Sequence, residues 1–96
     1  MEYQLRIYTV RPGEMEEWLD EWQRHVLPLR RRFGFEVLGP WVTEGEDRFV
    51  WILGYEDERG WAAADAAYYE SDERTSLEPD PARHLAGVET WMMRSP

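Results

Sequence analysis

Hydrophobic side chains alternate along residues 48–55 in a pattern that predicts a β-strand buried on both faces. Branched and aromatic residues with a period of two are typical of strands, whose successive side chains point to opposite faces. In a small antiparallel sheet one face commonly meets water, so the second face of this strand requires a cover. Both alternate sets are mostly apolar: Phe49, Trp51, Leu53 and Tyr55 on one face, and Arg48, Val50, Ile52 and Gly54 on the other.

Three further segments have the composition and boundaries of strands. We predict strands at Tyr3–Val10, Phe35–Glu44 and Val88–Arg94. Gly39-Pro40 predicts a bulge in the second of these segments, because glycine and proline both disturb a regular ladder. Gly45-Glu46-Asp47 is predicted to form the hairpin turn that leads into residues 48–55.

The spacing of the apolar residues changes to that of a helix after Pro12-Gly13. Acidic residues fill the first half of its polar surface and arginines the second half, which complements the helix dipole. Pro28 predicts a kink or an early end, because proline lacks a backbone donor and clashes with the preceding turn. Gly34 is the expected C-terminal cap. The apolar positions recur at intervals of three and four: Met15, Trp18, Leu19, Trp22, Val26 and Leu29.

A second helix is predicted from Glu56 to Tyr69, with Asp57 as its N-terminal cap and alanines that permit close packing on a sheet. The polar segment from Ser71 to Pro81 is expected to be a loop with one helical turn near Arg74–Leu77. The resulting order, βαββαβ, predicts a single ferredoxin-like α+β domain over residues 1–96. Its core would be a four-stranded antiparallel sheet with two helices on one face.

The aromatic content adds a prediction about assembly. A chain of 96 residues buries only a modest core, yet this one contains 6 Trp and 5 Tyr. Large aromatic side chains in excess of one small core require a partner or a ligand. Because the two helices cover only one face, we predict a homodimer whose open sheet faces pair to close an α+β barrel. Such a barrel would leave a lined cavity between sheet and helices.

Charge and residue types exclude several classes of function. The net charge of −9 disfavours binding to nucleic acids and to anionic membranes. The chain lacks Cys and Lys, which removes disulfides, thiolate ligands and Schiff-base chemistry. Its 2 His lie far apart in the sequence and no nucleotide-binding fingerprint is present, so we predict neither a metal nor a cofactor. No apolar run approaches the ~20 residues of a membrane-spanning helix, so a cytoplasmic protein is expected.

Three blocks of sequence together resemble the NIPSNAP family. They are Tyr3–Gly13, Val26–Trp41 and Val50–Asp57, and the likeness spans nearly the whole chain. The resemblance implies a dimeric α+β barrel, in agreement with the strand that is apolar on both faces, and it implies little chemistry. The wider barrel superfamily includes cofactor-independent oxygenases, haem-degrading enzymes and isomerases, but that link is an analogy from fold alone.

Three polar side chains are candidates for catalysis in the predicted cavity. His25, beside the apolar stripe of the first helix, would act as a general base; alternatively it is a boundary histidine that packs its ring. Arg30 and Tyr69 would steady an enolate or phenolate. The alternatives are a solvated helix end for Arg30 and aromatic packing for Tyr69. The hypothesis requires all three side chains to converge on one cavity.

Four aromatic residues are predicted to line the ligand pocket: Trp22, Trp41, Trp51 and Tyr68. Core or dimer interface is the alternative for Trp41 and Trp51. We expect His84 to be structural or exposed. Three functions follow. The first is a homodimer that binds a small apolar or aromatic molecule. The second is a cofactor-independent oxygenase or isomerase with His25 as base. The third is a protein-interaction module that uses the acidic helix surface.

Overall fold

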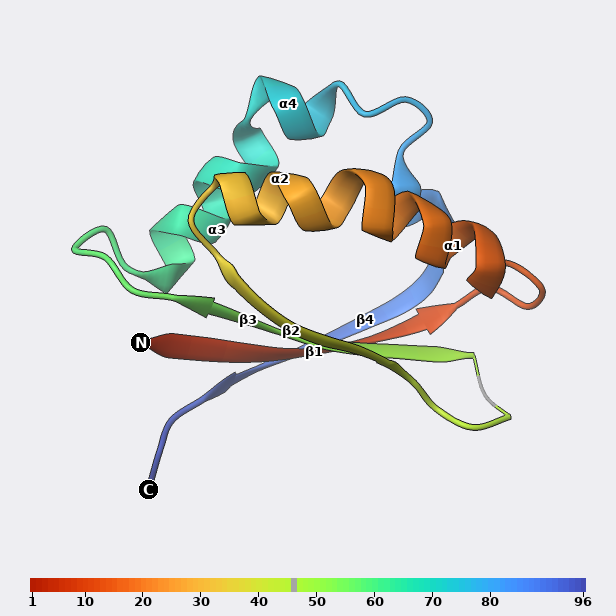
Figure 1. The fold of residues 1–96 in the computed structure, drawn as a ribbon, viewed down its shortest axis with the longest axis horizontal. Helices are drawn as coiled ribbons and strands as arrows, with labels where there is room; N and C mark the ends of the chain where they lie inside the picture. Colours follow the sequence, from red (N-terminus) through yellow and green to blue (C-terminus); the bar gives the residue numbers. More distant parts are fainter. Residues whose placement is uncertain (46) are drawn as a thin grey trace.

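The computed structural model describes residues 1–45 and 47–96 and shows a curved sheet with all helices on one side (Figure 1). The sheet has four antiparallel strands in the order β2-β3-β1-β4, which confirms the predicted ferredoxin-like α+β fold. The strands are β1 (Glu2–Val10), β2 (Glu36–Val42), β3 (Arg48–Tyr55) and β4 (Leu85–Met93). The helical segments are α1 (Met15–Glu21), η1 (Trp22–Val26), α2 (Leu27–Arg32), α3 (Trp61–Glu70), α4 (Asp72–Thr75) and η2 (Pro81–His84).

The pairing register assigns each strand side chain to one face of the sheet. Arg6 pairs with Trp51, and both side chains face the helices and are buried. The next position along β1, Leu5, pairs with Ile52 and Trp91, which therefore share the opposite face. Every second residue of β1 is thus covered by the helices, and the residues between them are only partly covered.

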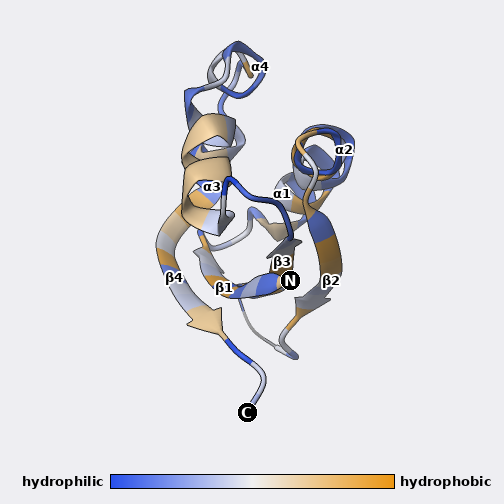
Figure 2. Ribbon diagram, turned by 90° about the vertical axis from the view of Figure 1, so that its left-hand side faces the viewer, coloured by the Kyte–Doolittle hydropathy of each residue, from blue (hydrophilic) through white to orange (hydrophobic). Residues whose placement is uncertain are grey.

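The face of the sheet away from the helices has no cover from any described segment of the chain (Figures 1 and 2). Its large apolar side chains are exposed to an extent that is unusual for a small protein. Trp41 has 53% of its surface exposed and Trp91 has 60%. Leu38, at 38%, and Met93, at 37%, belong to the same face. The prediction that one chain cannot cover both faces is therefore met.

Aromatic rings fill the layer between the sheet and the first helix. Trp22 meets the edges of Phe49 and Trp51 at ring-centroid distances of 5.2 and 5.4 Å. Tyr8 and Trp18 extend the cluster, with their centroids 5.8 Å apart. Edge-to-face contacts of this kind add to the hydrophobic free energy of burial, so this cluster holds the helix on the sheet.

The first helix runs through Pro28 and ends at Arg32, so the predicted early end was wrong. The irregularity lies just before the proline, where η1 is a π-helical turn and the N–H of Leu27 donates to the carbonyl of Trp22. A wider turn relieves the contact between the proline ring and the carbonyl one turn earlier. The predicted cap at Gly34 is confirmed, because this residue has φ +90° and its N–H donates to the Arg31 carbonyl.

The second predicted helix begins later than the sequence indicated. It starts at Trp61 because Gly60 adopts φ 87° and breaks the helical path. Asp57 instead caps a turn in the preceding loop, accepting from the N–H of Arg59. The register of β2 shifts between Leu38 and Trp41, which confirms the bulge at Gly39-Pro40. Of the predicted hairpin turn, Glu46 lies outside the described residues.

Strand ends also differ by a few residues from the prediction. The second strand is Glu36–Val42 rather than Phe35–Glu44, and the last begins at Leu85 rather than Val88. The helical turn predicted near Arg74–Leu77 is present two residues earlier, as α4 at Asp72–Thr75, where the Ser71 hydroxyl accepts from the N–H of Arg74. Within residues 1–45 and 47–96, no helix has the length and apolar character needed to cross a bilayer.

Candidate functional site

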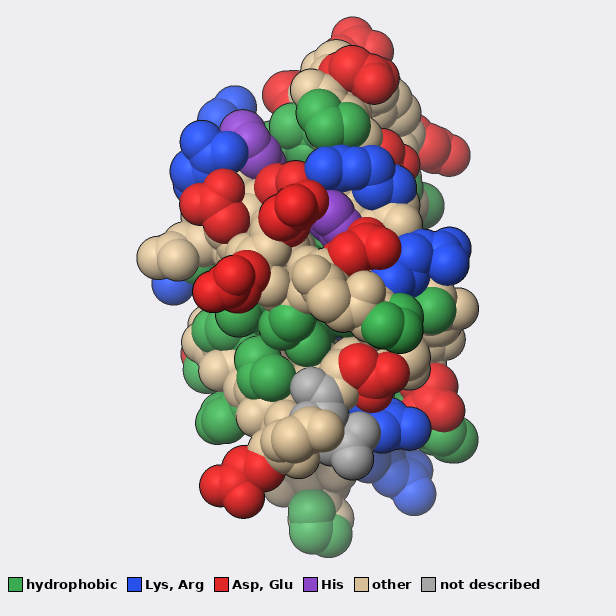
Figure 3. Space-filling model, turned by 90° about the vertical axis from the view of Figure 1, so that its right-hand side faces the viewer, with side chains coloured by type: hydrophobic (Ala, Val, Ile, Leu, Met, Phe, Trp, Pro, Cys, Tyr) green, Lys and Arg blue, Asp and Glu red, His purple; other side chains and the backbone are tan. Residues whose placement is uncertain are grey.

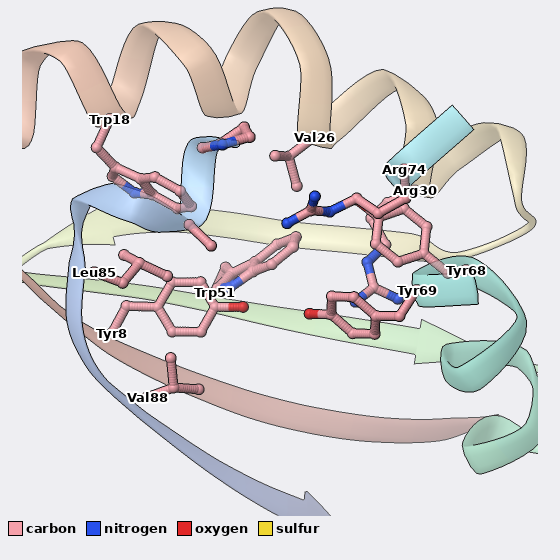
Figure 4. Close-up of a pocket in the computed structure, with 12 residues that line it drawn as sticks. Tyr8, Trp18, Val26, Arg30, Trp51, Tyr68, Tyr69, Arg74, Leu85 and Val88 are labelled. Atoms are coloured by element: carbon pink, nitrogen blue, oxygen red, sulfur yellow. The ribbon is translucent and has the colours of Figure 1, made fainter. Parts of the chain in front are cut away.

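A cavity of about 120 Å³ lies between the helices and the covered face of the sheet (Figure 4). Its walls come from β1, β3, β4, the first helix, the α3–α4 segment and η2. The inner wall is completely buried, with Trp51 at 1% exposure and Arg30 at 0%. Tyr69, at 43%, and Val88, at 55%, form the outer rim, so the cavity leads inward from the β4 side.

Arg30 reaches the cavity from α2 and packs its guanidinium against aromatic rings. Its central carbon lies 3.7 Å from the centroid of Tyr68, 5.1 Å from that of Tyr69 and 4.7 Å from that of Phe35. Nη1 of Arg30 is also 2.9 Å from Oδ1 of Asp65, which is an ion-pair distance. None of the N–H groups of Arg30 nevertheless forms a hydrogen bond with an acceptor among the described residues, because none points toward one at a suitable angle. Asp65 therefore offsets the charge of Arg30 without satisfying its donors.

A second arginine, Arg6 of β1, lies 3% exposed behind the tyrosines of the cavity. Its Nη1 donates to the hydroxyls of Tyr8 at 3.0 Å and Tyr69 at 2.8 Å, and Figure 4 shows these two hydroxyls pointing toward each other. Its Nε donates to Gln4 at 2.7 Å and its Nη2 to Asp65 at 3.0 Å. All three guanidinium nitrogens of Arg6 are thus bonded, in contrast with those of Arg30.

The ionisation states in this cluster follow from burial and from the arginines. Burial alone would lower the pKa of Arg6, but Tyr8, Tyr69 and Asp65 raise it above its usual value, so Arg6 stays charged. Burial raises the pKa of Tyr68 to about 12, even though Arg30 opposes the shift. Burial likewise raises the pKa of Tyr8. Near neutral pH both tyrosines are therefore protonated, and neither can serve as a base.

The structure brings together four of the seven residues predicted for the site. Arg30, Tyr69, Trp51 and Tyr68 all line the cavity. His25 does not join them, because it is exposed and lines a separate surface hollow with Glu21, Arg24 and the Leu77–Pro79 segment. The convergence of His25, Arg30 and Tyr69 on one cavity, which the catalytic hypothesis requires, does not hold.

Two of the predicted lining tryptophans also lie elsewhere. Trp22 is 2% exposed, but it packs between Phe49 and Trp51 in the core rather than on the cavity wall. Trp41 pairs with Val50 on the open face of the sheet. Trp22 thus lies in the core, and Trp41 lies on the exposed face of the sheet.

His25 lies outside the cavity because its neighbour Val26 occupies the inward position of this turn. Val26, at 6% exposure, belongs to the apolar stripe that the spacing predicts, and His25 beside it is exposed. Arg30 lies four residues after Val26 and is therefore buried on the same side of the helix.

Sequence reasoning missed Arg6, Tyr8 and Asp65. A signal for the first two exists in β1, where Gln4, Arg6 and Tyr8 form one alternate row and Leu5 and Ile7 belong to the other. Hydrophobic periodicity favours the row with Leu5 and Ile7 as the core-facing one, whereas the structure buries the row with Gln4, Arg6 and Tyr8 beneath the helices. Asp65 gives no such signal, because a lone acid in an alanine-rich helix usually faces water.

A second polar cluster surrounds His84, which is buried at 2% exposure. Acidic, arginine and histidine side chains gather on the face of the molecule that Figure 3 shows. Nδ1 of His84 lies 2.7 Å from Glu14 and its Nε2 lies 3.1 Å from Glu21. Burial alone would lower the pKa of His84, but these two contacts raise it above its usual value. Arg83 donates two hydrogen bonds of 2.8 Å to Glu21, and these contacts lower the pKa of Glu21. The cluster therefore ties η2 to α1.

The cluster at His84 also has the donor types of a metal site. Ligand atoms of His84, Glu17 and Glu21 lie within 4.8 Å of one another. Both oxygens of Glu21 already accept from the Arg83 guanidinium, and a cation beside that group would be repelled. The arrangement fits an internal salt bridge better than a metal centre.

The sequence matches the NIPSNAP family over residues 3–89. An uncharacterised NIPSNAP domain protein from Burkholderia xenovorans is similar, with a TM-score of 0.86 at 18% identity, over 100% of this chain and 95% of that one. A NIPSNAP family protein from Agrobacterium tumefaciens gives 0.85 at 18% identity, over 99% and 92%. A protein described as an antibiotic biosynthesis monooxygenase gives 0.75 at 17% identity, over 100% and 99%. At these identities the likeness concerns the fold. No curated protein matches the sequence.

Proposed function

Because this chain belongs to the NIPSNAP family, whose match spans residues 3–89, we propose that it is a homodimer that binds a small aromatic molecule in the cavity between its helices and sheet. The observation that carries the proposal is the cavity itself, with an aromatic wall and a buried arginine that has no hydrogen-bond acceptor among the described residues. Pockets that combine apolar walls with a few polar groups are typical ligand sites.

The cavity volume limits the size of the ligand. A dry engineered cavity of about 150 Å³ binds benzene. The cavity here, at about 120 Å³, therefore suits a single ring rather than a polycyclic molecule. Trp51 and Tyr8 provide flat surfaces against which such a ring can pack, with their own centroids 6.0 Å apart.

The open sheet face supports the dimer. Trp41, Trp91 and Met93 form an apolar surface that a monomer would expose to water. A second copy would cover the face with an identical apolar surface, which is how most homodimers form. Each cavity would remain within a single chain, since the residues that line it come from the helix side of the sheet.

Binding is better supported than catalysis. The oxygenase or isomerase hypothesis named His25 as base, and that side chain lies in a different hollow. The described residues that line the cavity include arginines and tyrosines but neither a histidine nor a carboxylate. Tyr8 and Tyr68 have raised pKa values and hold their protons. The remaining alternative, a protein-interaction module that docks through the acidic surface of α1, has no contact in the structure that favours it over ligand binding.

Calorimetric titration of small aromatic molecules into the full-length chain tests the binding proposal. The panel contains neutral and acidic single-ring compounds, with naphthalene derivatives for size. We expect single rings to bind and two-ring compounds to bind at least about tenfold more weakly, because the cavity cannot hold them. The absence of heat and of chemical-shift changes for every single-ring compound would contradict the proposal.

A matched pair of variants locates the site. Val88→Trp places a large ring at the cavity rim, where Val88 is 55% exposed, and we expect it to weaken binding at least about tenfold. Met92→Trp is the control, because Met92 lies four residues along the same strand, at 52% exposure, and does not line the cavity. Equal losses in both variants would place the ligand elsewhere.

A further inference from the structure

The guanidinium of Arg30 has hydrogen-bond donors that nothing in the described chain satisfies. It is completely buried, and Nε, Nη1 and Nη2 all lack an acceptor among the described residues. A guanidinium presents five N–H donors in one plane, and buried donors without acceptors destabilise a folded protein. The stacking on Tyr68 uses the face of this plane, and along its edge Asp65 lies 2.9 Å from Nη1 without meeting hydrogen-bond geometry. The site is therefore complete only when an acceptor enters the cavity.

The charge balance indicates that this acceptor is an anion. Arg6 and Arg30 share a single carboxylate, and the same Oδ1 atom of Asp65 lies 3.0 Å from one and 2.9 Å from the other. The third arginine near the cavity, Arg74, has its own partner in Asp80 at 3.1 Å. One buried positive charge thus remains in excess, and a ligand with one negative charge would neutralise it.

A second unused donor lies beside Arg30. The hydroxyl of Tyr68, whose ring lines the cavity, is buried and has no hydrogen-bond partner among the described residues. Its pKa, raised to about 12, keeps it protonated and therefore able to donate. A planar arginine fork matches the two oxygens of a carboxylate, and a neighbouring hydroxyl adds to such a site.

Resting on the proposed function, we propose that the ligand is a single-ring aromatic carboxylate, with its carboxylate bound by Arg30 and its ring packed against Trp51. Arg30 is the anion-binding and specificity-determining residue, because it is the only arginine of the cavity that lacks both a hydrogen bond and a carboxylate of its own among the described residues. The acidic surface of the protein, with a net charge of −9, does not assist the approach of such a ligand, so selection occurs in the cavity.

Titration of the full-length chain with benzoate, benzamide and acetate near neutral pH tests the inference. Benzoate and benzamide share the ring and differ in charge, and acetate has the charge without the ring. We expect benzoate to bind at least about tenfold more tightly than either, because a charge-assisted bidentate contact strengthens binding by at least that factor. Phosphate is included to detect a site that takes an adventitious ion only.

Variants of two adjacent arginines separate the role of Arg30 from general electrostatics. Arg30→Met removes the charge at similar size and should reduce benzoate affinity at least about tenfold while leaving benzamide affinity unchanged. Arg30→Lys keeps the charge without the fork and should give an intermediate loss. Arg31→Met is the matched control on the exposed side of α2 and should leave benzoate affinity unchanged. Circular dichroism verifies that each variant is folded.

The outcomes distinguish this inference from the function on which it rests. Equal affinities for benzoate and benzamide would overturn the anion inference and leave the aromatic cavity standing. Binding of phosphate or acetate as tight as that of benzoate would also overturn it, because a simple ion would then suffice. Failure of both aromatic compounds to bind would overturn the proposed function and the inference together.

Discussion

On the covered face of the sheet Arg6 is 3% exposed among aromatic rings, whereas on the open face Trp91 is 60% exposed. The two positions lie on neighbouring strands of one sheet, yet the charged residue is buried and the hydrophobic one meets water. Folding alone would favour the reverse, since burial of a charge costs free energy and burial of Trp gains it. This difference motivates the two parts of the proposed function: a ligand in the cavity of the covered face, and a second copy of the chain on the open face.

The largest effect is expected from removal of the charge that the two buried arginines share. Asp65→Asn leaves Arg6 and Arg30 without a counter-ion and should lower the free energy of unfolding by about 3 kcal/mol. Urea denaturation measures this change. Asp20→Asn is the control, because the exposed Asp20–Arg24 pair should contribute less than about 0.5 kcal/mol. Similar small losses in both variants would mean that the buried cluster is not electrostatically coupled.

A smaller effect is expected on the open face, and it should appear in association rather than in folding. Trp91→Glu places a charge in the proposed interface and should weaken dimerisation by about thirtyfold or more, which corresponds to a hot-spot loss of about 2 kcal/mol. Sedimentation velocity over a concentration series measures the constant. Ala63→Glu, on the exposed surface of α3, should leave it unchanged. A dimer unaffected by Trp91→Glu would locate the interface elsewhere.

The smallest effect is expected at the contact that ties η2 over the cavity. The raised pKa of His84 means that the folded state binds its proton more tightly than the unfolded state. The stabilisation that this proton gives the folded state is complete below about pH 6.5, the usual pKa of histidine. It is lost as the pH rises through the higher pKa that His84 has in the folded state.

The free energy of unfolding of the unaltered chain should therefore decrease as the pH rises above neutral. His84→Gln should abolish this decrease. The charged groups around the ring are Glu14, Glu17, Glu21 and Arg83. His25→Gln is the control, because that side chain is exposed and its substitution should keep the pH dependence. Urea denaturation between pH 6 and 8 measures both, and a slope that persists in His84→Gln would contradict the assignment.

The arrangement of strands and helices followed from the sequence because it depends on periodicity. The strand at residues 48–55 has the predicted bounds, and its apolar character on both faces correctly indicated an uncovered sheet. The start of α3 was missed because it depends on one backbone angle, the φ of 87° at Gly60. Periodicity contains no information about such an angle.

The site was predicted only in part. Arg30 and Tyr69 were correctly placed near a common cavity, but His25 was not. Val26 lies on the buried stripe as its spacing predicts, and His25, beside that stripe, is exposed; a helical period does not say whether a residue at the edge of the stripe reaches a cavity. Arg6 was missed because alternation alone does not say which row of the first strand faces the helices, and the structure buries the row that contains Gln4, Arg6 and Tyr8.

Fluorine NMR of the chain labelled with 5-fluorotryptophan tests the assignment of the two faces most directly, because its 6 tryptophans report on both. Benzoate should shift the signals of Trp18 and Trp51, which line the cavity, and leave those of Trp41 and Trp91 in place. Dilution to below the dimer dissociation constant should shift the signals of Trp41 and Trp91 and leave those of Trp18 and Trp51 in place. Benzoate-induced shifts confined to Trp41 and Trp91, or signals of these two residues that never change on dilution, would contradict the account.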